Sequence, residues 1–441
     1  MLKKITKSLS KIDYKLFISL LVLGLAPTIY TTLRVFFLGN LPGEWSLSIA
    51  GQLSWVNLLY EILGEAIVLP LFFFIGKVIA NKVEFANRMK TGLIVSVSAY
   101  TLLSIIIIAL VKPLLALMAT DATILDASAS YIRIESIANI FSLAFSFIMV
   151  GMVTLGREKC VYTLTAIKLV LCLIFDTFMV STLPISLNLG VNGIAFSNII
   201  VNLILVATAI YMLNKEGVSL FSKQKLSFTW MKDFAKIGGI SGVESLVRNV
   251  AYMLMIARMV NTVGEQGTYW VANNFIWGWL LLPVLQLGEL IKRETATDKN
   301  AVKNNSLGYF AITAFICIAW CVSIPLWKPF MANVLNFSEV DKLFELVLTL
   351  LGFYMLYAFQ NVFDSTFYGL GKTHYMLFES VVTNAIYYGG AFVLYLCGAW
   401  TPSLIGIALL FGIGNAFDSI VSLVAYLFLL KKQQINILKI E

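Results

Sequence analysis

The chain has 441 residues, of which 59% are hydrophobic and only 13% are charged, and its mean hydropathy is +0.86. Soluble domains carry about 25% charged residues, so a soluble protein of this composition could not cover its surface with polar groups. The composition therefore excludes a soluble enzyme, a secreted disulfide scaffold and a single-pass receptor. It also disfavours an outer-membrane barrel, whose strands give a weak hydropathy signal. We expect an all-α polytopic membrane protein.

Twelve apolar stretches are long enough to cross a bilayer, which takes about 20 residues per helix. They lie at residues 15–38, 49–75, 92–111, 130–154, 161–183, 191–213, 237–261, 269–291, 308–327, 344–368, 375–398 and 403–430. The predicted domains are a cytoplasmic tail at 1–14, an N-terminal six-helix lobe at 15–213, a cytoplasmic linker at 214–236, a C-terminal six-helix lobe at 237–430 and a cytoplasmic tail at 431–441.

The net charge of +8 comes from 32 basic and 24 acidic residues, and the basic residues alternate between loops. One set of alternate loops, which includes both tails, holds 24 of the 32, whereas the opposite loops hold only Lys112, Lys328 and Lys342. By the positive-inside rule, both termini are cytoplasmic and the number of spans is even. This explains the excess charge as a topology signal. No nucleic-acid partner is expected, and the predicted location is a cytoplasmic membrane of the bacterial type.

Two short motifs recur at matching spans. Leu-Gly-Glu occurs at 63–65 and 287–289, and Leu-Gly followed by a basic residue occurs at 155–157 and 370–372. The spacing indicates a duplicated unit of six spans. An even number of spans per unit gives both copies the same orientation, so we expect two six-helix lobes related by a parallel pseudo-two-fold repeat. Such symmetry is typical of transporters that work by alternating access.

The sequence contains no recognisable nucleotide, cofactor or metal site. Lys372 follows Gly371 as in a phosphate loop, but Thr366 stands where that motif needs its first glycine. The five cysteines form no CxxC pair, and His374 is the sole histidine. We therefore expect no catalytic residues, no cofactor and no metal site, and we predict that a Na⁺ or H⁺ gradient supplies the energy.

Charged residues inside predicted spans are candidate binding residues, because an intramembrane charge is costly. The candidates for substrate or ion binding are Asp176, Arg34, Glu61, Glu65, Glu244, Arg248, Asp364 and Asp418. The spacing leaves a structural alternative for some of them. Glu244 and Arg248 are four residues apart and could form a pair within one helix. Asp364, like Glu289 and Glu379, is close enough to the cytoplasmic end to be solvated or paired with a loop lysine.

Several segments resemble the multidrug and toxic compound extrusion (MATE) transporters, and the resemblance covers nearly the whole chain. Pro27 and Gly39 fit the family's opening segment, and Gly156 and Asp176 fit its Gly-Asp-Thr-Lys…Asn-x-x-x-Asp segment. Residues 190–200, GVNGIAFSNII, are similar to the start of the family's sixth span. Glu244 falls on a commonly acidic position of span 7. The resemblance implies a twelve-helix antiporter that exports small organic or drug-like molecules.

The departures from this family fall on its cation sites. Arg34 stands at the position of the span 1 Asp, which lines a cation site with the span 5 Asp. Cys172 replaces the Asn one turn before Asp176, and the span 10 Asp of some members falls near Tyr357, with Asp364 further on. We hypothesise that Arg34 pairs with Asp176 and replaces the cation by a fixed guanidinium. Arginine favours carboxylate or phosphate partners, which leaves an anionic or zwitterionic substrate open.

The function predicted from the sequence is a MATE-like secondary exporter, a monomer whose partners are a small-molecule substrate and membrane lipids. Two alternatives stay open. One is a flippase for lipids or lipid-linked precursors in the same superfamily, and the other is a non-transporting membrane protein that kept the fold.

Overall fold

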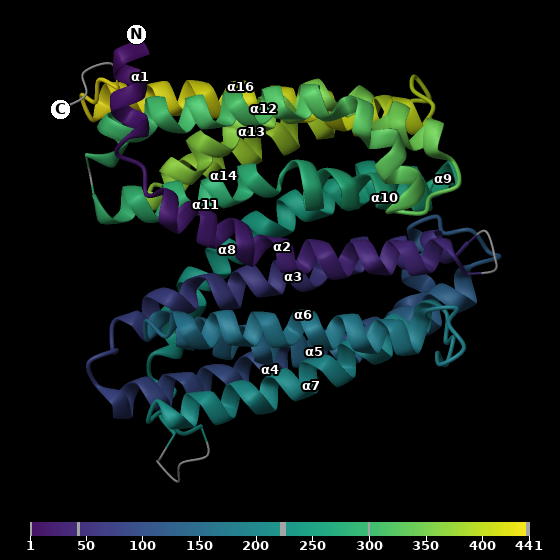
Figure 1. The fold of residues 1–441 in the computed structure, drawn as a ribbon, viewed down its shortest axis with the longest axis horizontal. Coiled ribbons are helices and arrows are strands. Elements are labelled where there is room, and N and C mark those ends of the chain that lie inside the picture. The colour runs from purple at the N-terminus through teal and green to yellow at the C-terminus, as the bar shows by residue number, and fades with distance from the viewer. Residues whose placement is uncertain (1, 42–44, 221–225, 299, 438–441) are drawn as a thin grey trace. The chain divides into compact units, whose positions relative to one another are not determined.

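The computed structural model describes residues 2–41, 45–220, 226–298 and 300–437 (Figure 1), and within them every regular element is a helix. The helices are α1 (Leu2–Leu9), α2 (Tyr14–Gly39), α3 (Ser46–Gly76), α4 (Lys82–Leu117), α5 (Leu125–Thr154), α6 (Glu158–Val180), α7 (Val191–Lys215), α8 (Met231–Tyr252), η1 (Met253–Ala257), α9 (Arg258–Thr262), α10 (Gln266–Phe275), η2 (Ile276–Leu280), α11 (Leu282–Thr297), α12 (Ala301–Asn333), α13 (Val340–Gly369), α14 (His374–Val382), η3 (Thr383–Tyr388), α15 (Gly389–Leu396) and α16 (Leu404–Lys432). Four of the predicted cytoplasmic lysines, Lys223, Lys225, Lys299 and Lys439, lie outside the described residues.

The predicted spans all fall on helices. In the described chain, ten helical stretches are long and apolar enough to cross a membrane, and the pair Gln266–Leu280 and Leu282–Thr297, bent by 52°, makes up to an eleventh. The remaining predicted span, 49–75, coincides with α3, a helix of 31 residues. This confirms the all-α, multi-pass fold class.

Residues 33–270 form one compact unit, in which α5 is the central helix. Helix α5 packs against α3, α4 and α7 (Figure 1), and its Phe147 and Ile148 side chains are fully buried. Helix α8 packs along α3 at a close crossing. A Cβ atom on Gly238 would clash with the backbone oxygen of Ala66, so glycine is needed for the two backbones to approach.

Residues 1–32 and 271–441 form the second unit, in which α13 is the central helix. It packs against α11, α12 and α16 (Figure 1). Helices α5 and α13 are the fourth spans of their halves, and each contacts the second, third and sixth spans of that half. This shared contact pattern supports the predicted parallel repeat.

The first span of each half packs with the second span of the other half. Helix α8 lies along α3, and the hydroxyl of Thr28 on α2 donates a hydrogen bond to the Gly278 carbonyl on η2 at 2.9 Å. The chain therefore passes between the two compact units inside helices, at Thr32/Leu33 and Trp270/Val271. The predicted lobe boundaries, 15–213 and 237–430, follow the chain order instead and stay a prediction.

The two ends of the chain flank the start of α12. The Gly308 amide donates to the Ser8 hydroxyl of α1 at 2.8 Å, and the hydroxyl groups of Ser306 and Tyr426 lie 3.1 Å apart. Tyr426 belongs to the last turns of α16, so α1 and the end of α16 lie at the same end of α12 (Figure 1). This arrangement is what an even number of spans requires.

Three of the predicted spans contain a π-helical turn in the described chain: η1, η2 and η3. Such turns are rare and are frequently found at functional sites. The turn η3 carries Thr383, whose role is described below.

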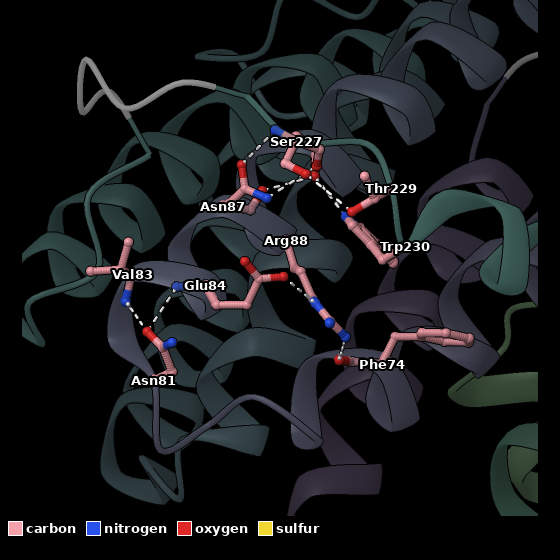
Figure 2. Close-up of polar contacts among 10 residues, drawn as sticks. Phe74, Asn81, Val83, Glu84, Asn87, Arg88, Ser227, Thr229 and Trp230 are labelled. Carbon is pink, nitrogen blue, oxygen red and sulfur yellow. Dashed lines mark hydrogen bonds and ion pairs between the residues drawn. The ribbon is translucent and has the colours of Figure 1, made fainter.

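The segment that precedes α8 is fixed to the start of α4 by polar contacts (Figure 2). The Asn87 side chain donates to the Ser227 carbonyl and accepts from the Ser227 amide, both at 3.0 Å. The Trp230 indole nitrogen donates to the Thr91 hydroxyl at 3.1 Å, and the Arg88 guanidinium lies 5.7 Å from the centre of the Trp230 ring. These contacts attach the last residues of the linker to the bundle.

We expect the Asn87→Ala variant to unfold at a lower temperature than the wild type. The change removes both hydrogen bonds to the half-buried backbone of Ser227, and each such bond contributes about 0.5–1.5 kcal/mol to stability. Thermal unfolding of the detergent-purified protein measures the effect. Ser219→Ala is the control, because Ser219 lies on the same linker as Ser227 but is exposed. Equal melting temperatures for the two variants would contradict the prediction.

Candidate functional site

A buried ion pair links α2 and α6. The Arg34 guanidinium donates from Nε to Asp176 Oδ2 at 2.7 Å and from Nη2 to Oδ1 at 3.2 Å. Asp176 has no exposed surface, and the Arg34 side chain is 13% exposed. Cys172, one turn before Asp176, is buried as well. Both carboxylate oxygens of Asp176 are therefore occupied by the guanidinium, as the sequence-based hypothesis expects.

The same guanidinium reaches two further helices through an amide. Arg34 Nη2 donates to Asn198 Oδ1 on α7 at 2.6 Å, and Asn198 Nδ2 donates to Glu135 Oε1 on α5 at 2.7 Å. A continuous polar chain thus joins Asp176, Arg34, Asn198 and Glu135. Neither Asn198 nor Glu135 is among the sequence-predicted residues. Glu135 lies within the predicted span 130–154, so the rule that selected the other intramembrane charges applies to it equally.

Three carboxylates meet one guanidinium between α3 and α8. Arg248 Nη2 lies 2.7 Å from Glu65 Oε1, while its Nη1 and Nε lie 3.6 Å from Glu61 and Glu244 respectively. The pair within one helix expected for Glu244 and Arg248 is present, but the shortest contact crosses to α3. The Arg248 side chain is 43% exposed. The cluster of Glu61, Glu65, Glu244 and Arg248 is thus accessible and carries more acidic than basic groups.

The structure also brings together Asp364 and Asp418, through the side chain of Gln360. Gln360 Nε2 donates to Asp418 Oδ2 at 2.6 Å and to Asp364 Oδ2 at 3.2 Å. Hydroxyl groups occupy the other oxygens: Ser422 donates to Asp364 Oδ1 and Thr383 of η3 donates to Asp418 Oδ1, each at 2.7 Å. These contacts join α13, η3 and α16.

Glu379 of α14 belongs to the same cluster, which corrects an expectation. It is 3% exposed and interacts with Asp364 and Ser422. Pairing with a loop lysine is therefore wrong for Glu379 and Asp364, because neither contacts a Lys or Arg among the described residues, and solvation is wrong for Glu379 because it is buried. The expected pairing holds for Glu289, which pairs with Lys292 at 2.7 Å. The sequence shows that Asp364 and Glu379 lie near helix ends, but it does not show that α14 and α16 pack around these two carboxylates.

In the described chain, no group of three or more His, Cys, Asp or Glu side chains is placed to hold a metal ion. What the clusters can do chemically is exchange a single positive charge, from a proton, a monovalent cation or a charged substrate group.

We expect the Arg34→Ala variant to be destabilised by about 3–5 kcal/mol, because it leaves the buried Asp176 carboxylate without its cation. Removing both partners in Arg34→Ala/Asp176→Ala eliminates the uncompensated charge and should recover part of the loss. Thermal unfolding of the four proteins of this double-mutant cycle gives the coupling. Strictly additive single effects would show that the pair does not act as a unit.

The sequence matches no family model and no curated protein. The fold, however, matches solved structures over nearly its whole length. A multidrug resistance MATE family transporter of the MOP superfamily, in an inward-facing conformation, shares 18% identity and covers 93% of this chain and 95% of its own, with a TM-score of 0.73.

Two further structures show the same similarity. A mutant of the Vibrio cholerae MATE transporter VcmN shares 15% identity, with 99% of both chains covered and a TM-score of 0.71. A MOP superfamily transporter from Pyrococcus furiosus shares 17% identity, with 100% of this chain and 99% of its own covered and a TM-score of 0.66; reverse polarity of its binding pocket suggests a different function for it. The chain therefore has the fold of the MATE transporters of the MOP superfamily.

Proposed function

We propose that this protein is a secondary active exporter that moves small organic or drug-like molecules outward by alternating access, driven by a Na⁺ or H⁺ gradient. It acts as a monomer in a cytoplasmic membrane. The observation that carries the proposal is the carboxylate cluster of Asp364, Glu379 and Asp418, enclosed by membrane-spanning helices in a transporter fold.

Three carboxylates that have no basic partner among the residues the structure describes are costly within a bilayer. The cost falls when the cluster takes up a cation, and a site that binds and releases a cation as its surroundings change couples transport to an ion gradient. The hydroxyl and amide groups around the cluster support this interpretation, because Gln360, Thr383 and Ser422 orient single carboxylate oxygens without neutralising them.

The cluster around Arg248 supports an organic cation as substrate. Glu61, Glu65 and Glu244 outnumber the single guanidinium, and the group is accessible. Arg34 supports the opposite polarity at its own position, and the related Pyrococcus furiosus transporter has a binding pocket of reverse polarity. The transport assay described next therefore compares a cationic with an anionic substrate.

We expect purified protein in proteoliposomes to move a fluorescent organic cation only when a Na⁺ or H⁺ gradient is imposed. The Asp364→Asn and Asp418→Asn variants should show no increase in flux when the gradient is imposed, because each removes a carboxylate that would take up the coupling cation. The readout is the initial flux with each gradient alone, for a cationic and for an anionic dye.

Asp341→Asn is the control, since Asp341 is an exposed partner of Lys328. Absence of gradient-dependent flux for every dye would reject the proposal. If the vesicles instead show rapid exchange of labelled lipid between leaflets, the flippase interpretation takes its place. Failure of both assays leaves the non-transporting protein.

A further inference from the structure

Glu135 is a buried carboxyl group with one unpartnered oxygen. The residue is 6% exposed, and its Oε1 accepts from Asn198 Nδ2. Its Oε2 is fully buried and has no hydrogen-bond partner in the described part of the chain. A buried carboxylate oxygen in a protein is normally hydrogen-bonded or ligates an ion, so the position of this atom favours a carboxyl group that takes up a proton or an ion.

The charges around Glu135 do not balance. The charged and titratable groups that face it are Arg34 from α2, Asp176 from α6, Tyr131 on α5 itself and Tyr60 from α3. The one cation among them, Arg34, already donates to both oxygens of Asp176 and reaches Glu135 only through the neutral amide of Asn198. Two carboxylates thus share one guanidinium.

Further unpartnered polar atoms lie along the same helix faces. Asn192 of α7 contacts Ser130 of α5, and Asn198 contacts Glu135, so the two helices run in the same direction with matched register. One turn further on, this register brings Asn202 of α7 level with Asn139 of α5.

Both of these asparagines carry a buried polar atom without a partner: Asn139 Nδ2 and Asn202 Oδ1. Ser197 Oγ, beside Asn198, is a third. Since unpaired amides and hydroxyls in an apolar bundle are expensive, their occurrence on α5 and α7 within about one helical turn of Glu135 and Asn198 indicates a polar site that takes water or an ion.

We propose that Glu135 binds one monovalent cation, H⁺ or Na⁺, in the polar site between α5 and α7, and that it is the coupling carboxyl group of residues 33–270. Asp176 is already compensated by the Arg34 guanidinium, which donates to both of its oxygens. Glu135 is the remaining carboxylate of the polar chain, and one added positive charge balances that chain. The coupling role rests on the proposed transport function, whereas cation binding does not.

Binding is tested on the detergent-purified full-length protein without any transport step. Infrared difference spectra reveal a protonated carboxyl group by a C=O band that shifts in D₂O, and a filtration assay with radioactive Na⁺ counts bound ions. We expect Glu135→Gln to lose either one titrating carboxyl band or one bound Na⁺ per chain. Which of the two is lost identifies the cation.

Glu289→Gln is the matched control, because Glu289 is accessible and already paired with Lys292; it should bind like the wild type. Glu135→Gln retains an oxygen that accepts from Asn198, so the fold should be kept. If that variant does not purify as a single species, Glu135→Asp replaces it and should retain one cation with a shifted pH midpoint.

A Glu135→Gln variant with an unchanged carboxyl band and unchanged Na⁺ binding would overturn the inference. The two proposals fail separately. If Glu135→Gln loses the cation but the wild-type protein shows no gradient-driven flux, the inferred binding site stands and the proposed transport function is rejected. If the wild-type protein shows gradient-driven flux but Glu135→Gln binds the cation as the wild type does, only the inferred binding site is rejected.

Discussion

The polar chain from Asp176 through Arg34 and Asn198 to Glu135 is the interaction on which the arrangement of residues 33–270 depends. It ties α2, α5, α6 and α7 together at one level of the bundle. In a bilayer, apolar side chains of neighbouring helices gain little from one another beyond packing, since lipid is equally apolar. Polar contacts of this kind therefore specify which helices are neighbours and in what register.

The two compact units differ in how they compensate their buried charges. Residues 33–270 contain two arginines, Arg34 and Arg248, that meet acidic clusters, whereas the carboxylates of Asp364, Glu379 and Asp418 are held by amide and hydroxyl groups. The two units share a packing plan, with α5 and α13 in equivalent central positions. They nevertheless differ in how their buried carboxylates are compensated.

Much of the fold was predictable from the sequence because hydropathy reports directly on spans, whereas the direction of the spans inferred from the loop lysines stays a prediction. The pairing of Arg34 with Asp176 was also predictable, because the resemblance to the MATE transporters places both residues at one site. Pairings that depend on which helix faces which were not. Glu379 reaches Asp364 only because α14 packs against α16, and Glu135 matters only because Asn198 lies at its level on α7. Likewise, the exchange of first spans between halves depends on contacts such as Gly238 with Ala66, which no local signal reveals.

The π-helical turns η1, η2 and η3 have a consequence for how these spans can be altered. A turn closed by i→i+5 hydrogen bonds holds one residue more than the α-helical turn it replaces, so it offsets the angular position of everything that follows by about 100°, the rotation per residue of an α-helix. A single-residue deletion within Thr383–Tyr388 would restore a regular helix and turn α15 away from its present neighbours, or Thr383 away from Asp418. In the span that contains η3, the length of the sequence is itself a determinant of the site, and a deletion that removes no polar side chain can dismantle it.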